Sequence, residues 1–460
     1  MTRLNNNQAK QYQMAVTSQR QQPFFANENG EPLYNAFNEL NFVYPKMGEN
    51  SVDSGDIPRI WTWAMDSKGE KCERVAYFHI PFCETHCIYC FYYKNLLPTD
   101  EGNYYVDYVI QELEMIADTP FINSHPFHAI YLGGGTPTAL SAHNLKRLLK
   151  SIRKYLPLAN DCEITVEGRI YNFTDEKISA CIDGGANRFS IGVQTFDTSV
   201  RQKMGRKENK ESLIERLQYL RNLDQAPMSI DLIFGLPYQT MEIWADDVTQ
   251  FVQLELDGLS TYPLLVLKGT KLEKAINKGI MPPPGDIITK ADMFLRGVEI
   301  MNSTRCHRIF FNHWAKTSRE RSIYPKTAAK DCIPFGSGAR GQFKGYLLHQ
   351  DRNLKEYYKK IDEGHKPIAW CGKPSEHYKL FLDLVGQIEM RHCNIRGIGQ
   401  RYGLDLEEIF FPLLKQWERV GLIKMDEGWI ELTLAGEFWL GNLCQGLVDY
   451  FFCNYQHDSC

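Results

Sequence analysis

Three cysteines that follow a short apolar segment constrain this chain more than any other feature of its sequence. Val75–Ile80 has the length and the β-branched and aromatic content of a buried strand. Pro81 cannot continue a central strand, so a loop is predicted to begin there. That loop carries Cys83, Cys87 and Cys90 at C-x3-C-x2-C spacing. Three thiolates within so short a loop can converge on one metal centre.

The number of cysteines limits the kind of metal centre. A cubane iron–sulfur cluster normally takes four cysteine thiolates, so three predict a cluster with one iron left open to an outside ligand. A structural zinc ion needs four closed ligands, and His79 or His86 would have to complete such a site. Unrelated buried cysteines are a third interpretation. The aromatic ring of Tyr89, directly before Cys90, would cover a cluster from water.

From Val75 onward, short apolar runs alternate with helical patterns. The candidate strands are Val75–Ile80, Ala129–Leu132, Glu163–Glu167, Arg188–Val193, Met228–Phe234 and Gly258–Leu265. The candidate helices are Tyr104–Ala117, Ser141–Tyr155, Asp175–Asp183, Glu208–Leu223 and Glu242–Leu254, with Ser141 and Asp175 as caps or first-turn residues. Such alternation gives parallel strands joined by right-handed crossovers. Six units with the last edge unpaired predict an α/β fold, a partial (β/α)6 barrel.

Polar groups follow four successive predicted strands, at the end where barrels of this kind carry function. They are the run Gly133–Thr138, the pair Glu167 and Arg169, then Gln194 and Arg206, and finally Asp231. Consecutive glycines let a backbone approach a ligand and offer it N–H groups, although a tight strand-to-helix turn is an equal alternative. The Asp231 charge in an apolar strand needs a partner or a ligand, and a structural salt bridge is the alternative to a ligand.

A ligand that fits these positions has an amino-acid head and a nucleoside tail. Its amine and carboxylate would chelate the open iron, while the glycine backbone and Arg206 would hold the head. Glu167 would take the ribose hydroxyls. S-Adenosylmethionine (SAM) is such a ligand, and its sulfonium beside a reducing cluster can be cleaved to a carbon radical. The protein would then orient the cofactor and exclude water.

The order of motifs resembles the radical SAM enzymes related to oxygen-independent coproporphyrinogen oxidase. The motifs are YFHIPFC-x3-C-x2-C, GGGTPT, TVEG, RFSIGVQTF, GR and IDLIFGLPYQT, spread from Tyr77 to Tyr262 with a weaker match to Gly345. The resemblance implies a [4Fe-4S] cluster on Cys83, Cys87 and Cys90, with Asp231 completing the catalytic set. It also implies that cluster-bound SAM contacts Tyr77, Gly134, Glu167, Gln194, Arg206 and Asp231. A second SAM would contact Gly135, Thr136, Ile233 and Tyr262.

Within this group the chain is most similar to the ChuW/HutW type of anaerobic haem-degrading methyltransferases, the anaerobilin synthases. The stretches LPLANDCEITVEGRIYNF, GANRFSIGVQTFDT, HWAKTSRERSIYP and FGSGARG carry that likeness. It implies a radical SAM C-methyltransferase that opens haem without oxygen to a methylated linear tetrapyrrole and releases iron. Phe91 stands where the resemblance predicts glycine, which bears on the pocket above the cluster. Methylation or cyclopropanation of a natural product, and haem delivery by a SAM-binding chaperone, are the alternatives.

Haem as the substrate would need its own contacts. A hydrogen-bonded structural histidine is the default interpretation of His313, beside Trp314, which is also the best candidate for an axial ligand of the haem iron. Arg169, Arg319 and Arg321 are candidates to pair with the haem propionates, although a solvated face explains the last two as well.

The chain divides into three predicted parts. Residues 1–74 form an N-terminal arm, loosely held to about residue 35, and an irregular strap from Leu40 to Trp63. The strap is expected to pack on a neighbouring surface, with cover of an active site as the alternative. Residues 75–346 form the barrel, and residues 347–460 a helical, winged-helix-like domain. In this last part, helices are expected at Glu376–Glu389 and Leu406–Val420, a turn at Glu427–Gly428, and core positions at Trp429, Phe438 and Trp439.

Composition excludes several classes of function. The net charge of −4 and the pI near 6.3, with no basic stripe beside the wing, argue against a nucleic-acid-binding protein. No apolar run is long enough for a membrane span. Most of the 13 cysteines are scattered singly, which indicates a reducing, cytoplasmic setting. A low-potential cluster needs a reductant, so a flavodoxin or ferredoxin is the expected partner, and the chain is expected to be a monomer or weak dimer.

Overall fold

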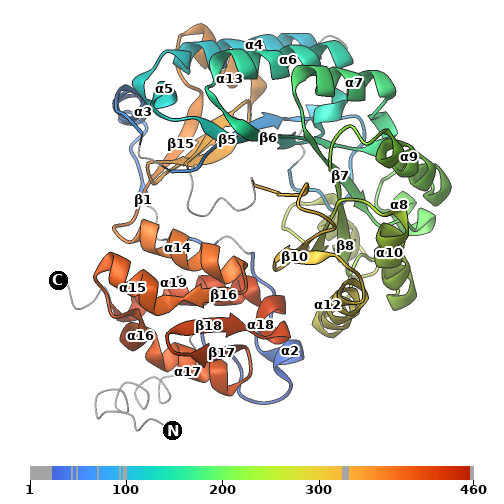
Figure 1. Ribbon diagram of the computed structural model, residues 1–460, viewed down its shortest axis with the longest axis vertical. Coiled ribbons are helices and arrows are strands. Elements are labelled where there is room, and N and C mark those ends of the chain that lie inside the picture. The colour runs from blue at the N-terminus through green and yellow to red at the C-terminus, as the bar shows by residue number, and fades with distance from the viewer. Residues whose placement is uncertain are drawn as a thin grey trace.

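The structure is a computed structural model that describes residues 23–42, 45–47, 50–69, 72–92, 95–96, 101–323 and 331–455. Figure 1 shows a curved sheet with helices along its outer face, and a separate group of helices and short strands, coloured orange to red, at one side of it. The main sheet has 13 strands, and a three-stranded sheet belongs to the second group.

Six parallel strands form the centre of the main sheet. They are β2 (Arg74–Ile80), β5 (Phe127–Gly134), β6 (Leu158–Gly168), β7 (Arg188–Gln194), β8 (Met228–Phe234) and β9 (Gly258–Pro263). Each pairs in parallel with the next in that order, so all six predicted strands are confirmed. Their residues are buried almost without interruption, as expected for parallel strands covered on both faces.

Helices follow the strands and lie along the outside of the sheet (Figure 1). The predicted ones are α4 (Glu101–Ala117), α6 (Ala142–Tyr155), α7 (Asp175–Gly184), α9 (Lys210–Leu223) and α10 (Met241–Leu254). Ser141 caps α6 by accepting a hydrogen bond from Asn144 N at 3.2 Å. Thr174 caps α7, so Asp175 is a first-turn residue. Their side-chain oxygens satisfy backbone N–H groups that the first helical turn leaves free.

The edges of the parallel sheet are both paired, so the predicted unpaired last edge is wrong. Beyond β9 run the antiparallel strands β11 (His313–Ala315) and β10 (His307–Phe310). Beyond β2 run the parallel β12 (Asp331–Phe335) and then β13 (Arg340–Phe343), β14 (Tyr346–Gln350), β15 (Ile368–Lys373) and β1 (Asn50–Ser51). An open edge would expose backbone N–H and C=O groups, and these strands satisfy them.

The predicted domain boundary at residue 347 falls within the main sheet. That position lies inside β14, and β15 follows it in the same sheet after α13 (Leu354–Asp362). We therefore propose that the second domain begins at α14. Its elements are α14 (Tyr378–Glu389), β16 (His392–Asn394), α15 (Ile395–Tyr402), α16 (Leu406–Ile409), α17 (Phe411–Arg419), β17 (Ile423–Asp426), β18 (Trp429–Leu432), α18 (Leu434–Phe438) and α19 (Leu440–Asn454).

The predicted wing is present, with two local corrections around it. Glu427 and Gly428 have φ of 43° and 86°, as the two central residues of a tight hairpin turn require. The predicted helix Leu406–Val420 is two helices, and Pro412 sits in the first turn of the second one, where its missing N–H costs nothing. Trp429 is 47% exposed and is not a core residue, whereas Phe438 and Trp439 are buried.

The described part of the N-terminal arm is firmly packed, contrary to the predicted loose arm. Phe24 is 1% exposed, and its carbonyl accepts a hydrogen bond from Trp417 Nε1 at 3.0 Å. The Gln416 side chain bonds both backbone groups of Ala26. An aromatic side chain inserted into the second domain thus fixes residues that composition alone suggested were solvated. Residues 1–22 lie outside the described part.

The remaining elements are short or lie between the main ones. They are α2 (Pro32–Asn35), α3 (Ile57–Asp66), α5 (Pro120–Ser124), α8 (Thr198–Lys203), α11 (Lys271–Asn277), α12 (Ile287–Asn302), β3 (Phe82–Cys83), β4 (Asn95–Leu96) and two 3-10 turns, Pro137–Ala139 and Ile170–Asn172. The predicted strap is therefore partly helical, because it contains α3. Within the described residues, no helix combines the length and apolar character needed to cross a membrane.

The burial of Phe24 gives a stability prediction. Phe24→Ala removes a ring that packs against Tyr450 at 5.2 Å between centroids, and is expected to lower the free energy of unfolding by about 3 kcal/mol or more. Urea unfolding measures this loss. Ile280→Ala, at a residue 71% exposed, is the control and should change stability by less than about 0.5 kcal/mol. An equal, small effect of both changes would mean that the arm does not stabilise the fold.

Candidate active site

A cavity of about 500 Å³ opens at the carboxyl ends of the parallel strands, a volume typical of small-molecule sites. One wall comes from the loops that follow β3, β5, β6, β7, β8 and β9. The opposite wall comes from the second domain, the β10–β11 turn, α12 and the strap. The site therefore lies where the barrel meets the second domain.

The three cysteines lie on the loop between β3 and β4 at the barrel side of this cavity. Cys83 and Cys87 are buried, and Cys90 is half-buried. Cys90 N donates to Cys87 O at 3.1 Å, which curls the loop. The loop is also tied to the body of the protein, because Ile88 N donates to Met204 O at 3.2 Å and Ile88 O accepts from Leu272 N at 2.8 Å. The cysteine positions are therefore held before any ligand binds.

Two guanidinium groups act on Cys87. Arg206 Nη1 lies 3.5 Å from its sulfur, and Arg169 Nη2 also donates to it. Burial opposes ionisation of this thiol, but the charges of Arg206 and Arg169 outweigh burial and lower the pKa of Cys87. Burial raises the pKa of Cys83. Because the thiolate is the form that binds metals, the positive surroundings of Cys87 fit a cluster ligand.

The zinc alternative gains no support from the described residues, in which no group of three His, Cys, Asp or Glu side chains converges on the position of a single metal ion. His79 is instead hydrogen-bonded to the Tyr77 hydroxyl through Nδ1 at 3.0 Å. Burial lowers the pKa of His79 to about 4. A cubane differs from a zinc ion in that each thiolate binds its own iron, so the sulfurs need not meet at one point.

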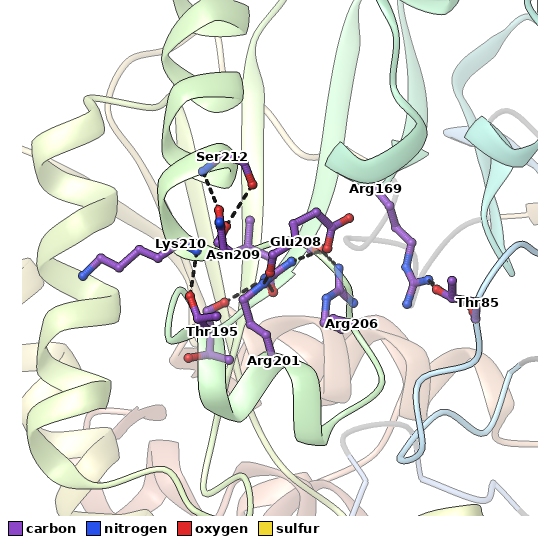
Figure 2. A network of polar contacts seen from close by, with 12 residues as sticks. Thr85, Arg169, Thr195, Arg201, Arg206, Glu208, Asn209, Lys210 and Ser212 are labelled. Carbon is purple, nitrogen blue, oxygen red and sulfur yellow. Dashed lines mark hydrogen bonds and ion pairs between the residues drawn. The ribbon is translucent and has the colours of Figure 1, made fainter.

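Arg206 is held by a network that sequence reasoning missed (Figure 2). Arg201 pairs with Glu208 at 2.7 Å and donates to the carbonyls of Val193 and Thr195, both at 2.8 Å. This closes the segment after β7 into a compact turn that carries Arg206. Arg206 Nη2 donates to a backbone carbonyl, while its Nε has no hydrogen-bond partner within the described chain. One guanidinium N–H is thus left for a ligand.

Figure 2 also shows Arg169 reaching Thr85 on the cysteine loop. Arg169 Nη1 donates to Thr85 Oγ1 at 2.6 Å and to Thr85 O at 3.2 Å. The Arg169 side chain therefore braces the cysteine loop, and the structure does not support the predicted pairing of Arg169 with a propionate.

Two buried carboxyl groups face the cavity from the barrel. Glu167 accepts hydrogen bonds from Tyr131 OH at 2.7 Å and from Gly134 N at 3.2 Å. Burial raises the pKa of Glu167 to about 7 and that of Asp231 to about 6. Asp231 lies near Ser190 Oγ at 3.5 Å. Both side chains are acceptors that a ligand's hydroxyl or ammonium groups can satisfy.

Glycine is required where the strand β5 ends. Gly134 has a φ of +108°, and a Cβ at Gly135 would lie 2.5 Å from Phe82 O. This close approach packs the glycine run directly behind the cysteine loop. Thr136 Oγ1 lies 3.3 Å from Cys83 Sγ, so the run contacts the loop through a side chain as well.

The structure brings nearly all the predicted site residues to this cavity. Those that line it are Cys87, Tyr89, Cys90, Gly134, Gly135, Thr136, Glu167, Gln194, Arg206, Asp231, Ile233 and Tyr262, together with Phe91. Cys83 lies behind Thr136, and Tyr77 lies one hydrogen bond away through His79. Gln194 has a φ of 71°, an uncommon conformation for a side-chain-bearing residue.

The candidate haem contacts His313, Arg319 and Arg321 do not line the cavity. His313 has no exposed surface and bonds Ser260 Oγ at 2.8 Å and Glu320 Oε1 at 3.2 Å. Its ring nitrogens are therefore occupied inside the barrel, which confirms the structural interpretation. Arg319 and Arg321 form exposed ion pairs with Asp224 at 2.6 Å and Asp161 at 2.9 Å, away from the cavity.

Sequence reasoning missed the wall that faces the barrel. It is lined by Leu40, Asn41, Phe42, Phe294, Phe310, Phe311, Asn312, Glu389, Glu437, Phe438, Leu440 and Gly441. No motif marks these residues, because they come from five separate parts of the chain. Leu40–Phe42 is the exception, because it belongs to the strap for which cover of an active site was the alternative. Asn41 N donates to Asn442 Oδ1 at 3.1 Å, which holds the strap at the cavity.

The buried Asp231 carboxyl gives a pH prediction. Its pKa is raised from the ordinary 3.8 to about 6, so the folded state holds this proton more tightly and stability falls as pH rises from about 4 through about 6. Asp231→Asn removes that loss and should stabilise the ligand-free protein by about 1–2 kcal/mol at pH 8, and by nothing below pH 4. Urea unfolding at both pH values measures the difference.

The control for this prediction is a carboxyl group with the opposite shift. Hydrogen bonding and the charge of Arg321 lower the pKa of exposed Asp161, so Asp161→Asn should bring no gain at pH 8. Equal stability changes at pH 4 and pH 8 for Asp231→Asn would contradict the prediction.

Comparison with known proteins places this site in a family. The Radical SAM superfamily model matches residues 77–250. The chain is 36% identical over 435 residues to anaerobilin synthase of Escherichia coli O157:H7, covering 92% of this chain and 94% of that protein. It is 28% identical to the heme chaperone HemW of Bacillus subtilis (strain 168), covering 80% and 97%.

A solved structure shares the fold. Coproporphyrinogen III oxidase (HemN) from Escherichia coli, a radical SAM enzyme, matches with a TM-score of 0.70 at 24% identity, covering 82% of this chain and 91% of that one. This likeness agrees with the parallel barrel and the helical second domain. By its matched domain and its 36% identity across nearly the whole length, the chain belongs to the radical SAM superfamily, in the family of anaerobilin synthase.

Proposed function

We propose that this radical SAM enzyme is a C-methyltransferase that opens haem without oxygen to a methylated linear tetrapyrrole and releases its iron. The observation that carries the proposal is the 36% identity to an anaerobilin synthase over 92% of the chain. The identity extends over both the barrel and the second domain, and so over both walls of the cavity.

The cysteine loop is proposed to hold the cluster through Cys83, Cys87 and Cys90. A cluster held there would supply the electron that cleaves SAM to a carbon radical. The charges of Arg206 and Arg169 lower the pKa of Cys87 and so favour the thiolate, the form that binds a metal. Tyr89 covers the loop, since its hydroxyl lies 3.4 Å from Arg206 Nη1, and it limits water access to the thiolates.

The barrel residues are proposed to bind two SAM molecules. For the first, Glu167 accepts hydrogen bonds from ribose hydroxyls, Asp231 faces the ammonium, and the free N–H of Arg206 meets the carboxylate; Tyr77, Gly134 and Gln194 complete this set. Gly135, Thr136, Ile233 and Tyr262 are proposed to contact the second. Support comes from their shared cavity and from the close-packed glycine run, which lets a ligand approach the backbone.

The wall opposite the barrel suits a flat, apolar ring. Phe294, Phe310 and Phe438 are each less than 10% exposed and line the cavity. Aromatic faces of this kind bury large area with little loss of conformational freedom. Phe91, 37% exposed at the barrel side, adds one more ring where a glycine was expected, and it narrows the space above the cysteine loop.

Arg340 and Arg352 are proposed to bind the propionates, in place of Arg319 and Arg321. Neither lines the cavity, but the Arg340 charge acts on Tyr92, which does. Arg340 begins β13 and Arg352 follows β14, and neither side chain makes a hydrogen bond or ion pair in the described chain. Burial and the Arg352 charge lower the pKa of Arg340. A Cβ at Gly338 would lie 3.6 Å from Arg352 Cγ and 3.8 Å from the His79 ring. Adjacent cations without an anion form a natural carboxylate site.

Other properties follow from the same proposal. We expect a cytoplasmic setting, since the cysteines that the structure describes are free thiols, and a flavodoxin or ferredoxin as electron donor. A monomer or weak dimer is expected. Haem delivery without degradation is the second candidate function, and the 28% identity to a heme chaperone favours it over a natural-product methyltransferase.

Anaerobic turnover with haem, SAM and a strong reductant tests the main proposal. Loss of the Soret band, release of iron and a methylated linear tetrapyrrole by mass are expected. Cys87→Ala should bind little iron and sulfide and lose all turnover, whereas exposed Cys453→Ala should behave as the wild type. Intact haem with an unchanged spectrum would reject haem degradation and favour the chaperone.

The arginine pair has a separate test. The double variant Arg340→Ala/Arg352→Ala is expected to raise the KM for haem by about tenfold or more, equivalent to about 1.4 kcal/mol, with kcat within about threefold. Haem titration of the anaerobic protein should show the same loss of affinity. Arg319→Ala removes an exposed arginine that is paired elsewhere and should change neither value. Unchanged haem affinity in the double variant would refute the assignment.

A further inference from the structure

One part of the cavity wall carries polar groups that no cofactor contact uses. Glu389 is the last residue of α14, and Asn312 lies in the turn between β10 and β11. The two segments are fixed side by side, because Phe311 N donates to Glu389 O at 3.1 Å. Both side chains line the same cavity, and neither belongs to a recognised motif.

Among the described residues, no charged or hydrogen-bonding group offsets the burial of the Glu389 carboxyl. The residue is 8% exposed, and within the described ranges its side chain makes no hydrogen bond or ion pair. Burial alone raises the pKa of Glu389 to about 8, so near neutral pH it is largely a protonated acid. Glu437, on the same wall, differs because Arg308 at 2.6 Å and Arg391 at 3.5 Å hold it as an ion pair.

The side-chain oxygen of Asn312 is also buried without a hydrogen-bond partner among the described residues. The residue as a whole is 6% exposed. Buried polar atoms without partners are uncommon because they are costly, and each calls for an explanation such as a ligand. A neutral carboxylic acid and an amide oxygen on adjacent segments thus line the same cavity as the apolar rings of Phe294, Phe310 and Phe438.

We infer that Glu389 and Asn312 form a proton-delivery subsite for the pyrrole nitrogens of the tetrapyrrole, an inference that rests on the proposed function. Haem iron is held by two anionic and two neutral nitrogens, so its departure as Fe²⁺ leaves two nitrogens that each need a proton. The Glu389 carboxyl gives a proton to one nitrogen, forming N–H and a carboxylate. A second proton from bulk solvent, relayed by water that enters the cavity, restores the acid for the second transfer, so the two protons come from solvent and no electrons are exchanged.

The amide of Asn312 then accepts a hydrogen bond from the new N–H. This makes the subsite selective: iron-bound haem offers no N–H group, whereas a metal-free linear tetrapyrrole does.

The test separates proton delivery from radical chemistry in the full-length, reconstituted protein. Glu389→Gln keeps the shape and a hydrogen-bond donor but has no transferable proton. With haem, SAM and reductant it should form 5′-deoxyadenosine within about twofold of wild type, while iron release, measured with a ferrous chelator, slows by tenfold or more. Glu389→Asp should restore part of that rate. Glu431→Gln, at an exposed residue of the same domain, is the matched control and should change neither.

Equilibrium binding gives a readout that does not depend on turnover. Biliverdin, a metal-free linear tetrapyrrole, should bind Asn312→Ala about five- to tenfold more weakly than wild type, while haem binding changes less than twofold. Both probes carry propionates, so the difference isolates the nitrogens. Circular dichroism excludes misfolded variants.

Two results would overturn the inference: iron release in Glu389→Gln that keeps pace with 5′-deoxyadenosine, or biliverdin affinity in Asn312→Ala equal to that of wild type. If wild type itself leaves haem intact, the proposed function fails, and the biliverdin titration alone then decides the subsite. Weaker biliverdin binding by Asn312→Ala would still support it.

Discussion

A buried ion pair between Arg188 and Glu320 holds the interior of the barrel together. Their side chains are 4% and 0% exposed and lie 2.7 Å apart. Arg188 also donates to Ser229 Oγ at 2.8 Å on the next strand, and Glu320 bonds His313, whose other nitrogen meets Ser260. Charges removed from water are costly unless they are paired and hydrogen-bonded. Strands β7, β8, β9 and β11 are therefore tied together by groups that satisfy one another.

This polar interior sets the chemistry of the site above it. The Arg188 charge partly offsets the burial that raises the pKa of Asp231, and the same holds, more weakly, for Glu167. The pKa values of the two carboxyl groups, about 6 for Asp231 and about 7 for Glu167, therefore stay close to neutral pH. At the cysteine loop, Arg206 and Arg169 favour the charged thiolate. The barrel side of the cavity therefore carries several ionisable side chains in fixed positions, which suits a charged cofactor. The opposite wall is mainly aromatic and carries few charges.

Local patterns predicted the barrel well, and long-range contacts explain the failures. The strands and helices were found because apolar periodicity is a property of each segment, and the site residues because parallel strands end at one edge. Two roles stayed open for His313, because its partner Ser260 is brought to it only by the pairing of β9 with β11. The packed Phe24 was missed for the same reason, since Trp417 lies 393 residues away. No local sequence pattern marks Glu389 and Asn312. They stand out only in the folded structure, where the Glu389 carboxyl and Asn312 Oδ1 have no hydrogen-bond partner among the described residues.

The division of the cavity between two domains explains why a family match alone does not fix the substrate. The superfamily match ends at residue 250, before Phe294, Asn312, Glu389 and Phe438, which form most of the opposite wall. A fold can therefore be kept while the chemistry changes, as the shared fold with a coproporphyrinogen oxidase illustrates. The residues proposed to bind the cofactor lie mainly on the barrel strands, and those proposed to face the substrate lie on the second domain, α12 and the β10–β11 turn. We therefore expect the contacts that select the substrate of this protein to lie on these latter elements, which the superfamily match does not reach.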